Sequence, residues 1–510
     1  MIPREVHPPV YQRPNSVTLY QRRNVARAYV QTIVLLLPIL IFYWAIPLSD
    51  KLSSLYSASN GTVPIYFCAV LILLAVRVLK EMPDALWSAV FWFPVQAAVF
   101  YGFGPLVEIY GNMTTQFSLA VHALAVDEIE LFRAHKLSTT GIACVLLAFY
   151  IHYLFRPNAW THIERSMASN VSLAFLGILS VLLGGVFKYL VLLPSLWGLS
   201  TLTVAGVLSV LGNLIDLGFA ILAFVIANGG RQHRLFFWLF WPLHLVLSLL
   251  TFSKTAVVLA MLLPLLGGYL ARRRRGRLLF GLLVIALVYA FLQPFVHYGR
   301  SEVYAISGTI NHAGYGKRAQ ILQQYIVSDD KTLNTDASRD ERQGWWTRLN
   351  FAGPQAKAMA LYDSGDANPT LGRAWMYFVP RAIWSNKPIM VGPGKEFNRM
   401  VTGNQGANSF LALSIYGDLY WQYGWPGVII GSLLIGLILA ELASQSVRVV
   451  RERNFIMLPV AFMALEMALL GPNKYVLNGV IGPLPIYLAF YFFLGWVSRS
   501  FRVRQGVHAF

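Results

Sequence analysis

Long apolar runs, each closed by a few polar residues, follow one another through most of this chain. A helix needs about 20 mostly apolar residues to cross a membrane, and these runs have that length. Lipid offers backbone groups no water, so only helices and closed barrels can span it, and continuous rather than alternating runs exclude the barrel. The pattern predicts an all-α polytopic membrane protein. Its 12 expected transmembrane helices lie at 28–48, 63–79, 84–105, 137–155, 170–191, 203–228, 235–252, 255–271, 278–296, 425–445, 455–471 and 476–497.

One long polar segment, at 297–424, interrupts this pattern. It separates a nine-helix region at 28–296 from a three-helix region at 425–497, with tails at 1–27 and 498–510. Helical spacing of its apolar residues predicts short helices at 317–326 and 353–363. The segment contains too few apolar runs for a large independent domain. We therefore expect it to lie over the mouth of the bundle.

Lys and Arg are distributed unequally among the loops. If the N-terminus is cytoplasmic, 22 of them lie in the inside tails and loops and six in the short outside loops. Positively charged loops are retained in the cytoplasm. We expect a multi-pass protein with both termini inside and the polar segment forming one large outside, periplasmic loop.

The overall composition agrees with a lipid environment. Charged residues make up 13% of the chain, against about 25% in an ordinary soluble domain. The net charge of +18 comes from cations at the ends of the runs, so it indicates membrane orientation and not a nucleic-acid partner. Two cysteines, Cys68 and Cys144, support neither a disulfide framework nor a zinc site. The first run has no small-residue cleavage site after it and is interpreted as a retained span.

Ionisable residues inside the runs are functional candidates, because a charge in lipid is costly. Asp216, His244 and Glu466 qualify, while Lys188 and Lys254 lie near the expected outer face. A transporter would use such residues as a relay. Here they are few and show no repeat symmetry, so hydrogen bonding inside the bundle is the competing interpretation.

The polar segment combines cations with aromatic residues. Guanidinium groups suit phosphate, and flat aromatic rings can stack on sugars. The competing interpretation is an interfacial aromatic belt with arginines on lipid headgroups. The residues concerned are Arg348, Arg373, Arg381, Lys387, Trp345, Trp346, Trp375, Tyr377 and Trp384.

The order of these residues resembles Wzy-type O-antigen and exopolysaccharide polymerases. The run PRAIWSNKPIMVGPGKEF at 380–397 contains the Pro-Arg-x-x-Trp-x-x-Lys-Pro element of that family. Asp418 then precedes Gly424 and Gly427, similar to the family's acidic residue and Gly-x-x-Gly motif before a helix. The pairs Arg381 to Gly392 and Arg342 to Gly353 fit its Arg-x10-Gly spacing.

The resemblance implies a GT-C-like bundle that polymerises undecaprenyl-diphosphate-linked oligosaccharides at the outer face of the bacterial cytoplasmic (inner) membrane. Its implied catalytic residues are Arg381 and Arg348, which stabilise the leaving diphosphate, and Asp418, a candidate general base that could instead brace its helix. Glu396 and His312 are further candidates for the base. The implied substrate-binding residues are Lys254, Arg300, Arg373, Trp384, Lys387 and Glu396. Membrane lipids and a chain-length regulator (polysaccharide co-polymerase) are the other expected partners.

No metal or cofactor is expected, because arginines can neutralise the diphosphate. The related O-antigen ligases are the nearest alternative. They carry a His-Asn pair where this chain has Ala407 and Asn408, which favours the polymerase. A flippase or transporter of lipid-linked oligosaccharides is the second alternative. It would need cations along a mid-membrane cavity and short outside loops.

Overall fold

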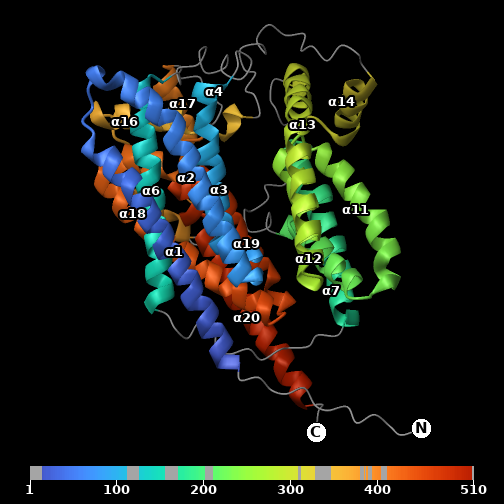
Figure 1. Ribbon diagram of the computed structural model, residues 1–510. Helices are drawn as coiled ribbons and strands as arrows, with labels where there is room; N and C mark the ends of the chain where they lie inside the picture. The colour runs from blue at the N-terminus through green and yellow to red at the C-terminus, as the bar shows by residue number, and fades with distance from the viewer. Residues whose placement is uncertain are drawn as a thin grey trace.

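The architecture is taken from a computed structural model, which describes residues 14–111, 126–155, 170–200, 211–307, 312–327, 346–379, 384, 386–388, 393–403 and 411–507. In these ranges all regular structure is helical (Figure 1). The expected all-α class is therefore confirmed for this part of the chain.

Ten helices among the described residues are long and apolar enough to cross a membrane. They are Arg23–Ala45, Asp50–Glu81, Ala89–Tyr110, Glu128–Phe155, Ser172–Leu196, Lys254–Ala271, Arg275–Ser307, Ser414–Arg451, Phe455–Asn473 and Leu477–Ser498. Each overlaps one of the expected spans. The other two expected spans, 203–228 and 235–252, contain shorter helices of 14 and 16 residues, and residues 201–210 are outside the described ranges.

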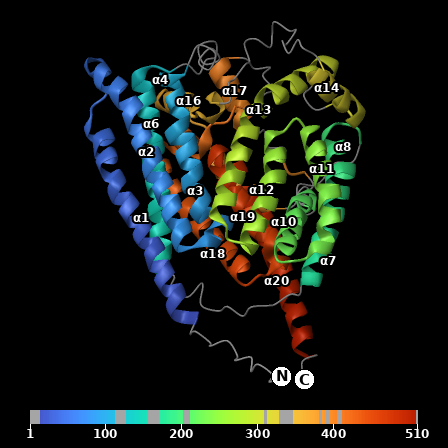
Figure 2. The same ribbon diagram turned by 45° about the vertical axis from the view of Figure 1, so that its right-hand side comes forward.

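The helices form two bundles that lie side by side (Figures 1 and 2). The first bundle contains α1 (Pro14–Ala45), α2 (Ser53–Glu81), α3 (Ala89–Ala97), α4 (Val107–Tyr110), α6 (Glu128–Phe155), α18 (Ser414–Arg451), α19 (Leu458–Leu470) and α20 (Pro483–Val507). The second contains α7 (Asn170–Gly185), α8 (Leu193–Leu196), α10 (Leu214–Ala227), α11 (Arg234–Leu249), α12 (Lys254–Ala271) and α13 (Arg275–Ser307). One apolar core runs through the first bundle and continues into α10 and α12.

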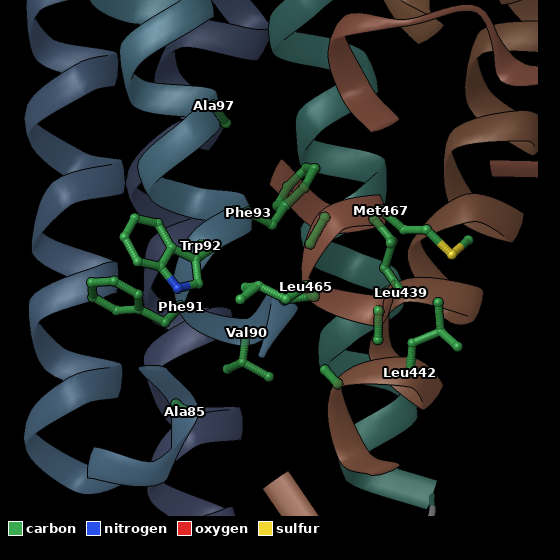
Figure 3. Packing of buried hydrophobic residues seen from close by; sticks show 14 of the residues in the cluster. Ala85, Val90, Phe91, Trp92, Phe93, Ala97, Leu439, Leu442, Leu465 and Met467 are labelled. Carbon is green, nitrogen blue, oxygen red and sulfur yellow. The ribbon is translucent and has the colours of Figure 1, made fainter. Parts of the chain in front are cut away.

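The most enclosed helices are α3 and α19. In the most apolar window of 89–110, 78% of residues are buried, against 18% in that of 275–307. Figure 3 shows Val90 and Phe93 of α3 near Leu465 of α19 and Leu439 of α18. Helices that are apolar on all sides belong in the centre of a membrane bundle. Helix α13, with one mostly exposed apolar face, has the character of a lipid-facing helix.

Close helix contacts in the second bundle depend on glycine. A Cβ at Gly267 of α12 would lie 2.0 Å from the carbonyl oxygen of Ala220 in α10. A Cβ at Gly184 of α7 would lie 2.1 Å from the backbone nitrogen of Ile215. Small residues let membrane helices approach backbone to backbone. Helix α10 is thereby held between α7 and α12.

The polar segment forms short helices at one end of the bundles, which we call the loop end. They are α14 (Tyr315–Val327), η7 (Thr347–Leu349), α16 (Ala352–Asp363), η8 (Thr370–Phe378) and α17 (Pro393–Thr402). Helices α14 and α16 confirm the two short helices expected at 317–326 and 353–363. The start of α1 and the end of α20 lie at the opposite end, which we call the terminal end (Figures 1 and 2).

An ionic contact joins the two bundles at the terminal end. Asp84, in the short helix η2 (Pro83–Trp87), accepts hydrogen bonds from Arg451 Nε at 3.2 Å and from Arg273 Nη2 at 2.8 Å. Arg451 ends α18 of the first bundle, whereas Arg273 lies between α12 and α13 of the second. The side chains of Asp84 and Arg451 are only 13% and 10% exposed. One carboxylate therefore neutralises cations from both bundles.

Replacement of this carboxylate is predicted to destabilise the protein. Asp84→Ala removes the carboxylate that the nearly buried Arg451 contacts, and we expect a loss of about 2 kcal/mol, because the pair is partly solvated. The midpoint of thermal unfolding in detergent should fall. Asp50→Ala, which removes an exposed carboxylate, is the control and should leave it unchanged. Identical midpoints for the two variants would contradict the bridging role.

Candidate functional site

Helix α16 of the polar segment is inserted between α6 and α18. Its Gln355 is 1% exposed and bridges the two helices: Ser138 Oγ donates to its Oε1 at 2.7 Å, and its Nε2 donates to Ser414 Oγ at 2.8 Å. A buried amide is stable only when both of its ends have partners. The polar segment is therefore anchored inside the loop end, as expected from its composition.

The chain before α16 is fixed against the first bundle. The Trp346 ring stacks on Phe103 at 5.0 Å, and its Nε1 donates to the Phe103 carbonyl at 3.0 Å. The Asn350 amide donates to Glu108 of α4. These contacts hold the backbone of Arg348, in η7, above that bundle. The Arg348 side chain itself lies outside what the structure describes.

Asp418 is enclosed in the first bundle. It is 1% exposed; its Oδ2 accepts the Val476 N–H at 2.8 Å, and its Oδ1 accepts the Gln422 side-chain amide at 2.7 Å. Gln422 Oε1 in turn accepts the Leu371 N–H at 2.8 Å. This geometry agrees with the alternative role of Asp418 as a brace for its helix, because Asp418 and Gln422 connect α18 to η8 and to the chain before α20. Action as a general base would first require these bonds to break.

The glycine motif of the sequence corresponds to a break in α18. Gly424 has a φ of +61°, which favours glycine, and interrupts the helix between Asp418 and the apolar run. A Cβ there would also lie 2.8 Å from the Tyr362 ring of α16. The break therefore lets α16 pack closely on α18.

Aromatic residues form a flat platform at η8. Trp375 and Trp384 stack with ring centroids 5.7 Å apart and an interplanar angle of 8°, and Trp375 is 55% exposed. Lys387 Nζ donates to the Val379 carbonyl at 3.1 Å and lies 5.9 Å from the Tyr377 ring centroid. An exposed indole beside a cation can stack on a sugar or hold an anion. The Lys387 N–H also donates to the Trp384 carbonyl at 3.1 Å, so the backbones of these two motif residues lie close together.

Other expected residues of this region are placed separately. Arg373 is exposed on η8, and Glu396 is half-buried on α17. Arg381, the central residue of the motif, lies outside the described residues, as do Gly392, Arg342, Ala407 and Asn408.

A second group of cations gathers at the loop end of the second bundle, around residues 250–254, which we call the 250–254 turn. Arg300 Nε donates to the Phe252 carbonyl at 3.0 Å. Lys254 Nζ donates to the Tyr289 hydroxyl at 3.3 Å and lies 4.3 Å from that ring's centroid. A Cβ at Gly299 would lie 2.3 Å from the Phe252 ring, so glycine lets α13 approach the turn. The turn thus connects two of the expected substrate-binding residues: Lys254 is its last residue, and Arg300 donates to its Phe252 carbonyl.

Arg318 of α14 fixes this turn from the side and was not predicted. It is 1% exposed, its Nη1 donates to the Leu250 carbonyl at 3.2 Å, and its Nε donates to that of Ala313 at 2.8 Å. Its guanidinium carbon lies 4.1 Å from the Trp197 ring centroid. Burial lowers the pKa of Arg318 to about 10, so it is still charged at neutral pH.

A sequence signal for Arg318 existed. Arg318 shares helical spacing with Ile321 and Tyr325, which face the apolar side of α14. An arginine on the apolar face of a helix must bury its charge against acceptors.

Loss of the Arg318 contacts is predicted to destabilise α14. Arg318→Met keeps much of the side-chain volume but leaves two carbonyls without this donor, and we expect a loss of about 2 kcal/mol. The unfolding midpoint of purified protein should fall. Lys317→Met, at the exposed neighbouring position, is the matched control. An equal midpoint in both variants would show that Arg318 does not hold the turn.

Comparison of the chain with protein-family models, curated protein sequences and solved structures gives no match. Its function is therefore inferred from the chemistry of these residues.

Proposed function

We propose that this chain is a membrane glycosyltransferase that polymerises oligosaccharide units carried on undecaprenyl diphosphate. In the reaction, a hydroxyl oxygen of one lipid-linked unit attacks the anomeric carbon at the reducing end of another chain. The bond from that carbon to the diphosphate oxygen breaks, and the diphosphate leaves with the electron pair. The hydroxyl proton passes to a base or to water.

The observation that carries this proposal is the position of Arg300, which is fixed at the 250–254 turn that Lys254 ends. Arg300 is exposed, and its one described hydrogen bond uses Nε, which leaves the two Nη groups to meet a ligand. A guanidinium fork suits a phosphate, and fixed cations stabilise the charge that grows on a leaving diphosphate. A lipid carrier would bring its diphosphate to the level of a membrane helix end.

The aromatic platform at η8 supports the same proposal. Sugar rings present flat apolar faces that stack on indole rings, and orienting two glycans is a large part of catalysis between them. Trp375 and Trp384 offer such a surface within the polar segment. In the proposed arrangement, the platform holds glycan while Lys254 and Arg300 hold diphosphate.

His312 is the candidate base that the geometry favours. It is exposed, and it precedes Ala313, whose carbonyl accepts Arg318 at the 250–254 turn. Glu396 is also accessible, whereas Asp418 is buried with both oxygens engaged. In this proposal Asp418 acts as a brace.

The orientation is part of the proposal. The unequal distribution of Lys and Arg assigns the terminal end to the cytoplasm and the loop end to the outside. The reaction then takes place at the outer face of the bacterial inner membrane. The chain-length regulator, if used, would approach the same membrane.

Deletion of the gene separates the proposed function from its alternatives, read by glycan gel electrophoresis. A polymerase leaves products that carry a single repeat unit, which is the expected result. Polymer that accumulates on its lipid carrier would identify a ligase. Lipid-linked units trapped in the cytoplasmic leaflet would identify a flippase. Either of these two outcomes would contradict the proposal.

Arginine replacements test the proposed role of the cations. Arg300→Ala and Arg381→Ala are each expected to reduce polymer about a hundredfold while the protein remains inserted and abundant. Arg300→Lys should recover only part of the activity, because lysine lacks the fork. Lys317→Ala, an exposed cation on α14, is the matched control and should leave polymer unchanged. Normal polymer in both arginine variants would remove the proposed diphosphate site.

A further inference from the structure

A buried ionic network lies inside the second bundle, below the 250–254 turn. Asp216 of α10 is 2% exposed; its Oδ2 accepts Lys188 Nζ at 3.0 Å and its Oδ1 lies 2.8 Å from His244 Nε2. His244 is 1% exposed, and Phe219 stacks on its ring at 5.4 Å. The three residues come from three different helices. Asp216 and His244 are thus paired with each other, in agreement with the interpretation as internal hydrogen bonding.

Hydrogen bonds hold both ring nitrogens of His244. Tyr189 Oη lies 2.6 Å from His244 Nδ1. If Nε2 carries the proton and donates to Asp216, then Nδ1 accepts from the Tyr189 hydroxyl, and every polar atom of the imidazole is used. The charges of Lys188 and Asp216 cancel. Such a network is stable in lipid only with its geometry intact.

The network reaches the loop end through Tyr189. Lys188 and Tyr189 lie in a π-helical stretch that continues α7, η5 (Val186–Leu192). Single π-helical turns are rare and often mark functional sites. The carbonyl of Tyr189 accepts the hydroxyl of Tyr315, the first residue of α14. The same helix carries Arg318, which donates to the Leu250 carbonyl at 3.2 Å.

The network also fixes the other side of the turn. His244 and Ser248 belong to α11, which ends at Leu249, directly before the 250–254 turn. The Ser248 carbonyl accepts the Thr251 hydroxyl at 2.7 Å. Both helices that hold the turn, α11 and α14, are therefore connected by hydrogen bonds to the same buried network.

We propose that Lys188, Asp216 and His244 are positioning residues for the proposed diphosphate site. They set the affinity of the chain for a polyprenyl diphosphate by holding α11 and α14, and so the 250–254 turn to which Arg300 is bonded. This inference rests on the proposed function. It assigns the intramembrane charges to binding at the loop end, and not to transport through the bundle.

The direct test is binding of undecaprenyl diphosphate to the full-length protein in nanodiscs. Asp216→Asn and Tyr315→Phe should each raise the Kd about tenfold, as when a group that orients a ligand-binding residue is removed. Tyr315→Phe removes one half-buried hydroxyl and keeps the test valid if Asp216→Asn does not fold. Tyr487→Phe, which removes a buried hydroxyl without a described partner in α20, is the control and should keep the Kd of the original protein.

The unfolding midpoint, measured on the same samples, separates positioning from simple bracing. The inference expects Tyr315→Phe to raise the Kd with little change in the midpoint. A lower midpoint with an unchanged Kd would mean that the network is only a structural brace, and would overturn it.

The test also separates this inference from the proposed function. If the original protein binds the diphosphate and Arg300→Ala weakens binding, but Asp216→Asn and Tyr315→Phe do not, the positioning role alone fails. If the original protein does not bind the diphosphate, the proposed function fails and the inference with it.

Discussion

The structure depends on one constraint: inside lipid, a charge must find its partner within the protein. The buried pair of Lys188 and Asp216 obeys it in the second bundle, and Asp84 with Arg451 obeys it where the bundles meet. In the described residues, exposed cations lie at both ends of the bundles, for example Arg273 at the terminal end and Arg300 and Arg373 at the loop end. The same constraint that shapes the bundles therefore keeps the accessible anion-binding groups at the ends of the helices.

At the loop end, two buried polar side chains are held by neighbours on several helices. Gln355 joins α16 to α6 and α18, and Asp418 joins α18 to the chain before α20. The polar atoms of these two side chains are used to hold the helices together. In the second bundle, Lys254 ends the 250–254 turn, and Arg300 of α13 donates to the Phe252 carbonyl of that turn. A preorganised site requires two kinds of group: buried polar groups that position the backbone, and accessible cations that bind the ligand.

Apolar runs and helical spacing were enough to predict the all-α class, ten of the spans and the short helices α14 and α16. Hydropathy does not predict the lengths of α10 and α11, because both are shorter than a spanning helix. Helix α10 is also packed through glycine contacts such as that of Gly267. The sequence also singled out Asp216, His244 and Lys188, but it could not pair them. They belong to three helices, and side-chain partners across helices depend on packing that has no local signal.

The chemistry of single residues was predicted less completely. Lys254 and Arg300 were selected for the same ligand, yet their common turn depends on the approach of Gly299 to Phe252. Asp418 was selected as a base or a brace, and only its two short hydrogen bonds distinguish the roles. Arg318 holds backbone carbonyls and belongs to no motif, so its sequence signal is limited to its position on the apolar face of α14.

A structure of the protein in nanodiscs with undecaprenyl diphosphate bound is the most direct measurement of the central idea. Density for the two phosphates should lie against the guanidinium of Arg300 and the ammonium of Lys254, with the polyprenyl chain running along the second bundle. Phosphate density at the terminal end, or at the loop end without contact to Arg300, would contradict it.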